Sequence, residues 1–242
     1  MSTQPVQGRY ADGKPKPRWR GALHAVVTAF LCIAIVATAG LLLAGRLERR
    51  RWSLLAFLLG KVASYGASTH LHFGAFRDLP SLTRALRWDF LAIPLSIGGN
   101  SFPLARSPVE AGAVVLATAA FFGANVLCVA RQMEGAVGLR TPNAGRGDGL
   151  RNAFLSIHCV FCYAHLAARR GVDGALASNV LLVIATLLLS LPVSAAHDEE
   201  PLDPRVPWHR PRVWGFHEDF HAVLLVGDFS MFLMVAGGNV GW

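Results

Sequence analysis

The last apolar run of the chain, residues 222–240, begins directly after Gly215-Phe216-His217-Glu218-Asp219-Phe220-His221. Two histidines four residues apart on a helix lie on one face, about 6 Å from each other. Both imidazoles can then bind one divalent ion, and zinc is the usual ion at such sites. Polar side chains at the mouth of a membrane helix are costly unless they bind something. This stretch therefore predicts a transmembrane helix that begins with half of a metal site.

The composition is that of a membrane protein. Hydrophobic residues make up 53% of the 242 residues and charged residues only 16%, whereas soluble domains carry about 25% charged residues. A transmembrane helix needs about 20 mostly apolar residues, and seven stretches qualify. They cover residues 22–44, 52–75, 87–104, 110–130, 152–168, 175–195 and 216–238. We therefore predict an all-α polytopic protein, with a seven-transmembrane helix bundle over residues 21–242 and a basic, mobile tail over residues 1–20.

The basic residues indicate the orientation of this bundle in the membrane. The formal net charge is +8, but in a polytopic protein Lys and Arg accumulate in the loops on the inner side. Most of the 23 Lys and Arg residues fall in inner loops if the N-terminus lies inside. We expect a cytoplasmic N-terminus, an external C-terminus, a location in the plasma membrane, and membrane lipids rather than nucleic acid as partners.

The second span ends in Ser68-Thr69-His70-Leu71-His72. Each helical residue is turned by about 100° from the last, so Ser68 and His72 lie about 40° apart on one face. His70 lies on another side of the helix, and we expect it to be an interfacial histidine that binds no metal.

The third span carries a polar stripe made of Asp89, Ser96 and Asn100. A carboxylate just inside a membrane span indicates a functional residue, and pairing with an inner-loop arginine is the structural alternative. Asp89 is therefore a candidate catalytic residue.

The candidate residues of three spans fall at one depth in the membrane. The predicted topology places the end of the second span, with His72, on the inner side. The third span begins on this side with Asp89, and the seventh begins there with His217 and His221. Three neutral imidazoles leave an open fourth position on zinc, which is typical of a catalytic site.

Two further polar groups have plainer interpretations. His24 lies at the inner edge of the first span, and we expect it to be a solvated polar tip. His158 and Cys162 are four residues apart in the fifth span and form a weak candidate for a second metal site. The Cys159-x-x-Cys162 spacing also occurs in redox proteins. Small polarisable residues commonly pack membrane helices, and we favour packing here.

Lys61 is the basic residue that falls inside a predicted span. It precedes His72 by eleven residues, which places it about 16 Å farther from the inner side. Asp228 follows His221 by seven residues on the same stripe of its helix. Because unpaired charges at this depth are costly, we predict a Lys61–Asp228 ion pair with Asn100 nearby.

Several motifs, in this order, resemble the hemolysin III / progestin and adipoQ receptor (PAQR) family. They are Pro17-Arg18-Trp19-Arg20-Gly21-Ala22-Leu23-His24, as in bacterial members, Ser68-x-x-x-His72, Arg87-Trp88-Asp89-Phe90 leading to Ile97-Gly98-Gly99-Asn100-Ser101, and the stretch 215–221. The resemblance implies a seven-helix bundle with zinc (Zn2+) held by His72, His217 and His221. It also implies that Asp89 and Ser68 orient or activate the zinc-bound water. The family is grouped with the alkaline ceramidases among membrane-embedded, metal-dependent hydrolases.

The expected function is zinc-dependent hydrolysis of a lipid amide or ester. Zinc lowers the pKa of bound water to about 7, and Asp89 would accept the proton. One alternative is a protease, because His217-Glu218-x-x-His221 matches H-E-x-x-H with Glu218 as general base. Asp228, the acidic residue downstream, lies about 10.5 Å along the helix and cannot complete that site. Another alternative is a non-enzymatic receptor or cytolysin with a structural zinc.

Overall fold

The computed structural model describes residues 19, 21–47, 52–74, 76, 79–105, 107–133, 144–171, 173–196, 205–209 and 213–237. This part of the chain forms seven α-helices and one 3-10 helix, so the all-α class is confirmed. The elements are α1 (Ala22–Leu43), α2 (Trp52–Phe73), α3 (Leu79–Ser101), η2 (Phe102–Leu104), α4 (Pro108–Met133), α5 (Ala144–Arg170), α6 (Gly174–Ala196) and α7 (Phe216–Gly237). The predicted tail lies outside the described residues apart from Trp19.

Two of the described helices are long and apolar enough to cross a membrane. They are α1 and the segment Pro108–Ala130 of α4, and a shorter apolar segment covers Gly174–Leu189 of α6. Polar residues lower the hydropathy of other helices, as buried Lys61 and Ser68 do in α2. The seven helices correspond in order to the seven predicted spans, whereas a crossing of the membrane by all seven stays a prediction.

Two helices begin about two turns before the spans that were predicted in them. Helix α3 begins at Leu79 and α5 at Ala144, where spans had been expected from residues 87 and 152. Pro80 lies in the first turn of α3, where a missing N–H breaks no helical hydrogen bond. Hydropathy marks the apolar part of a helix, but the backbone hydrogen bonds continue into polar residues at its ends.

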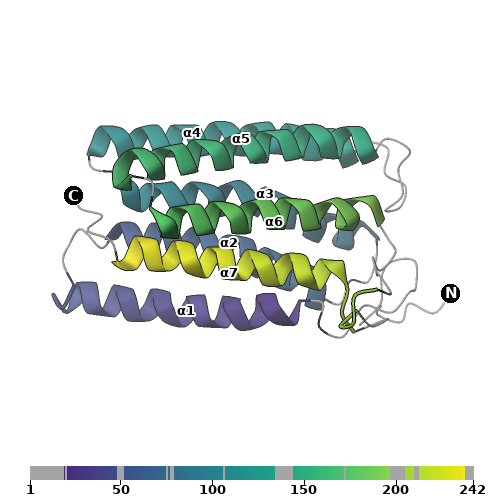
Figure 1. The fold of residues 1–242 in the computed structure, drawn as a ribbon, viewed down its shortest axis with the longest axis horizontal. Coiled ribbons are helices and arrows are strands. Elements are labelled where there is room, and N and C mark those ends of the chain that lie inside the picture. The colour runs from purple at the N-terminus through teal and green to yellow at the C-terminus, as the bar shows by residue number, and fades with distance from the viewer. Residues whose placement is uncertain are drawn as a thin grey trace.

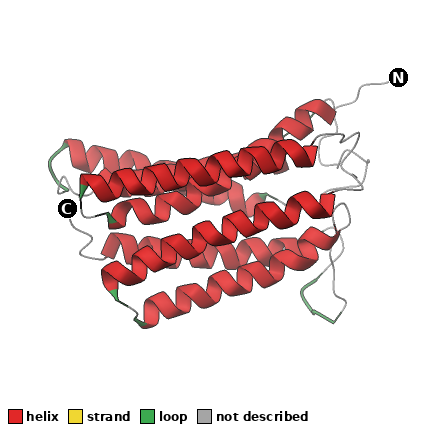
Figure 2. Ribbon diagram, turned by 90° about the horizontal axis from the view of Figure 1, so that it is seen from above, coloured by secondary structure: helices red, strands yellow, loops and turns green. Residues whose placement is uncertain are grey.

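The helices lie along one common axis and form a bundle (Figure 1, Figure 2). Helix α2 packs between α1 and α3, α4 packs against α3 and α5, and α7 packs against α6. Figure 1 shows that α1 and α7 begin at the end of the bundle where α2 finishes. Residues far apart in the sequence can therefore meet at this end.

The other end of the bundle contains the main apolar core. Its buried residues come from α2, η2, α5, α6 and α7, and they are Phe57, Leu58, Leu104, Leu166, Leu176, Met231, Met234 and Val235. We call this region the apolar end. Close helix contact continues from it along α2 and α3, because a Cβ at Gly60 would lie 2.6 Å from the carbonyl oxygen of Leu95. Small residues at such crossings let membrane helices approach closely.

Candidate metal centre

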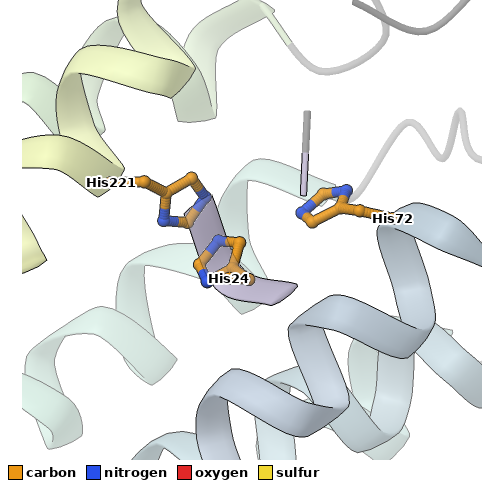
Figure 3. A group of neighbouring side chains, drawn as sticks. All are labelled: His24, His72 and His221. Carbon is orange, nitrogen blue, oxygen red and sulfur yellow. The ribbon is translucent and has the colours of Figure 1, made fainter. Parts of the chain in front are cut away.

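Four histidines from three helices meet where α2 finishes. His24 lies in the first turn of α1, His72 in the last turn of α2, and His217 and His221 in the first two turns of α7. Ligand nitrogens of His24, His72 and His221 all lie within 4.8 Å of one another, and Figure 3 shows their rings close together. The predicted ligand His217 is not part of this group, in which His24 stands instead, but it lies beside the group, since its Nε2 lies 2.8 Å from Nε2 of His221. We call these four residues the histidine cluster.

The geometry of the histidine cluster fits a metal ion. The ring centroids of His24 and His221 are 4.1 Å apart, and those of His72 and His217 are 5.3 Å apart. Two imidazoles on one zinc ion have nitrogens about 3.3 Å apart, as bond lengths of about 2.0–2.1 Å and a tetrahedral angle require. The nitrogens of His24, His72 and His221, which lie within 4.8 Å of one another, could therefore reach one ion after side-chain movements. Neutral imidazoles suit zinc, copper, iron and nickel.

The prediction for His24 is wrong, because its side chain is only 3% exposed rather than solvated. The cause is the chain preceding α1. Gly21 has a φ of 85°, and a Cβ there would lie 2.5 Å from Cβ of His72. The start of α1 therefore lies directly against the last turn of α2, which buries His24. The depth argument could have found this residue, since His24 was predicted at the same inner edge as the other candidates.

His70 lies apart from the histidine cluster, as the helical periodicity predicted. Its side chain is exposed, and its ring contacts the ring of Phe76 at a centroid distance of 5.5 Å. The two histidines of α2 therefore have different surroundings although only Leu71 separates them.

The predicted pair Ser68 and Asp89 is brought together next to the histidine cluster. Asp89 of α3 lies close enough to Ser68 of α2 for the two side chains to interact, and Ser68 lies one helical turn before His72. The positive charge of Arg151 acts on Asp89, and the Arg151 guanidinium lies 4.0 Å from the centre of the Phe90 ring. The Asp89 carboxylate thus lies near the Ser68 hydroxyl and within range of the positive charge of Arg151. Such a group can accept a proton and orient a polar ligand.

Glu218 has a structural role in the described chain. Its carboxylate is 1% exposed, and Oε2 accepts the backbone N–H of Gly215 at 2.9 Å. This is the helix-capping arrangement in which the third residue of a helix reaches back to the residue before it. The capping contact favours a structural glutamate over the general base of an H-E-x-x-H protease.

Asp219 ties the segment before α7 to this helix. Its Oδ1 accepts the indole N–H groups of Trp208 at 3.0 Å and Trp214 at 2.8 Å, and Oδ2 lies 2.6 Å from Nε2 of His209. The sequence analysis missed this contact. The contacts fix the start of α7, which carries two members of the histidine cluster.

The predicted Lys61–Asp228 ion pair is confirmed. Lys61 Nζ lies 2.6 Å from Oδ1 of Asp228 and donates a second hydrogen bond to Oγ of Ser96 at 3.0 Å. The Tyr65 hydroxyl donates to Oδ2 of Asp228 at 2.7 Å. This polar group joins α2, α3 and α7. Asn100 was expected nearby, but its buried Oδ1 has no hydrogen-bond partner among the described residues.

The weaker metal candidate in α5 consists of two separately packed side chains. The ring of His158 stacks on that of Phe121 at a centroid distance of 4.4 Å, and the Cys162 thiol donates to the carbonyl of Ile97 at 3.4 Å. These contacts connect α5 to α4 and α3. They favour the packing interpretation.

Comparison with models of protein families, with curated proteins and with solved structures finds no match to this chain. The function is therefore inferred from the geometry of the site, and the resemblance in the motifs remains a hypothesis.

Proposed function

We propose that this chain is a seven-helix integral membrane protein of the hemolysin III/PAQR type that hydrolyses a lipid amide or ester with a bound zinc ion. One observation carries the proposal. Imidazoles from three helices converge at one end of the bundle, and Ser68, which interacts with Asp89 of α3, lies one turn before His72. Buried polar groups that are not needed for packing indicate a binding or catalytic site.

The candidate ligands are His72, His217 and His221, with His24 beside them. A zinc ion there would supply a Lewis acid and a water of lowered pKa. The chain itself would supply the general base and the residues that orient this base. Asp89 can accept a proton, and the neighbouring hydroxyl of Ser68 can donate a hydrogen bond to its carboxylate. Arg151 stabilises the charge on this carboxylate.

The outer surface of the bundle supports a lipid environment. Large apolar side chains of α1 are exposed over the whole helix, and they include Val26 at 70%, Phe30 at 72% and Val36 at 73%. Contiguous exposed apolar surface marks a membrane or protein contact. A lipid substrate could reach such a bundle from the surrounding membrane without entering water. Its amide or ester bond would then lie near the histidine cluster.

The proposed hydrolysis is tested with zinc-loaded protein in detergent and a panel of ceramides, N-acyl amides and phospholipids. We expect turnover of at least one class, reduced about a hundred- to ten-thousand-fold in Asp89→Asn with the zinc content unchanged. Asp173→Asn is the matched control, because Asp173 caps α6 at the apolar end and asparagine caps equally well. No turnover of any lipid by fully loaded wild-type protein would contradict the proposal.

A non-enzymatic receptor with a structural metal is the second candidate, and one observation favours it. The fourth imidazole, from His24, could complete a tetrahedral shell, and structural zinc sites have four protein ligands. This candidate predicts that chelation lowers the thermal stability of the protein, whereas Asp89→Asn leaves every measurable property of the loaded protein unchanged.

A further inference from the structure

We infer that His24 is a metal ligand and that, together with His72, His217 and His221, it closes the metal site to water in the conformation described. The inference rests on the proposed metal site. It adds that the fourth coordination position is occupied by His24 rather than by water. Four nitrogens satisfy a tetrahedral zinc ion, whereas a hydrolytic zinc needs one position for water or substrate.

His24 is positioned for this role by contacts with three rings. Its ring lies 5.7 Å from that of His72 at an interplanar angle of 18°, and 4.1 Å from that of His221 at 81°. The ring of Tyr65 lies 5.4 Å away on a third side. His24 therefore lies between the two ligand-bearing helices, with its ring directed to the space that the other imidazoles share.

The start of α1 is fixed against α2 by two further contacts. Gly21 lies against His72, as its close approach shows, and the hydroxyls of Thr28 and Thr69 are 3.1 Å apart. The position of His24 thus follows from the packing of α1 on α2. A histidine on an exposed helix face would have no such constraint.

The start of α1 lacks a side-chain cap like that of α7, because the residue before it, Gly21, has no side chain. His24 lies in this first turn, and terminal turns open at the lowest free-energy cost, so His24 is the member of the histidine cluster whose helix end could open despite its packing on α2. His217 and His221, by contrast, lie in a helix start that Glu218 and Asp219 fix through hydrogen bonds. If the protein is a hydrolase, a bound metal would become accessible to water only when His24 leaves it, which would require the first turn of α1 to move from α2.

Zinc X-ray absorption on the purified full-length chain tests the inference without an activity assay. Wild-type protein should show nitrogen ligands at about 2.0–2.1 Å with the scattering of four imidazole rings. His24→Ala should show three rings and one oxygen, and added imidazole should restore the fourth. Its zinc affinity should fall by more than about tenfold, the lower limit for loss of a residue that only supports a ligand. His70→Ala is the matched control and should match the wild type.

Closure of the site is tested with the cobalt-substituted protein and azide. The visible spectrum of wild type should not respond to azide, while that of His24→Ala should shift. Three rings in the wild type, four rings in both proteins, or an azide response of the wild type would overturn the inference. If His24→Ala cannot be purified, the ring count and the azide response of the wild type decide. Absent lipid turnover in all variants would reject the hydrolase but leave a four-imidazole site intact.

Discussion

The two ends of the bundle bury different kinds of side chain. The apolar end brings together Phe57 and Leu58 of α2 with Met231 and Met234 of α7, and dispersion and hydrophobic burial suffice to hold them. The other end joins the same two helices through His72, His217 and His221. Imidazoles give little apolar burial, and desolvating them costs free energy. The apolar end thus supplies hydrophobic burial, whereas the other end gathers side chains that could hold a metal ion.

Loss of a histidine should give the largest effect. His221→Ala should reduce bound zinc from about one ion per chain to background, because His221 contacts every other member of the histidine cluster. Elemental analysis of purified protein measures this directly. His70→Ala should retain full zinc content, since His70 is exposed. Equal zinc loss in both variants would contradict the conclusion that His70 lies apart from the histidine cluster.

Between the two ends, the Lys61–Asp228 pair should give the next largest effect. Breaking a buried ion pair by removing one partner typically costs about 3–5 kcal/mol, so Lys61→Met and Asp228→Asn should each destabilise the protein strongly. The double variant should recover part of the loss, as measured by unfolding in detergent. Additive losses would show that the two charges are stabilised separately.

Truncation at the apolar end should reduce stability without affecting metal binding. Leu58 is 1% exposed, and Leu→Ala in a packed core costs about 2–5 kcal/mol. Leu58→Ala should therefore lower the thermal midpoint while zinc content stays at the wild-type value. Zinc loss in this variant would mean that the two ends are coupled rather than separate in function.

The smallest effect should come from Glu218, in the middle of the histidine motif. Glu218→Gln keeps an oxygen that can accept the N–H of Gly215 and removes a negative charge near the start of α7, which in a buried position contributes up to about 2 kcal/mol. Lipid turnover and zinc content should be unchanged. A complete loss of turnover with zinc retained would instead support Glu218 as a general base.

The sequence predicted the interior of the molecule better than its edges. Hydropathy located all seven helices, and helical periodicity separated His72 from His70 and paired Lys61 with Asp228. These features repeat along a helix axis, so a single sequence carries them. The place of His24 depends on how the start of α1 meets α2, and the contacts of Asp219 depend on the path of the preceding loop. Neither has a periodic signal.

The most direct test is a crystal structure of the zinc-loaded protein with anomalous data at the zinc edge. Our interpretation predicts one anomalous peak per chain at the histidine end, bonded to His72, His217 and His221, with His24 completing the shell. A peak at His158 and Cys162, or a zinc-loaded crystal without a peak among the four histidines, would contradict it.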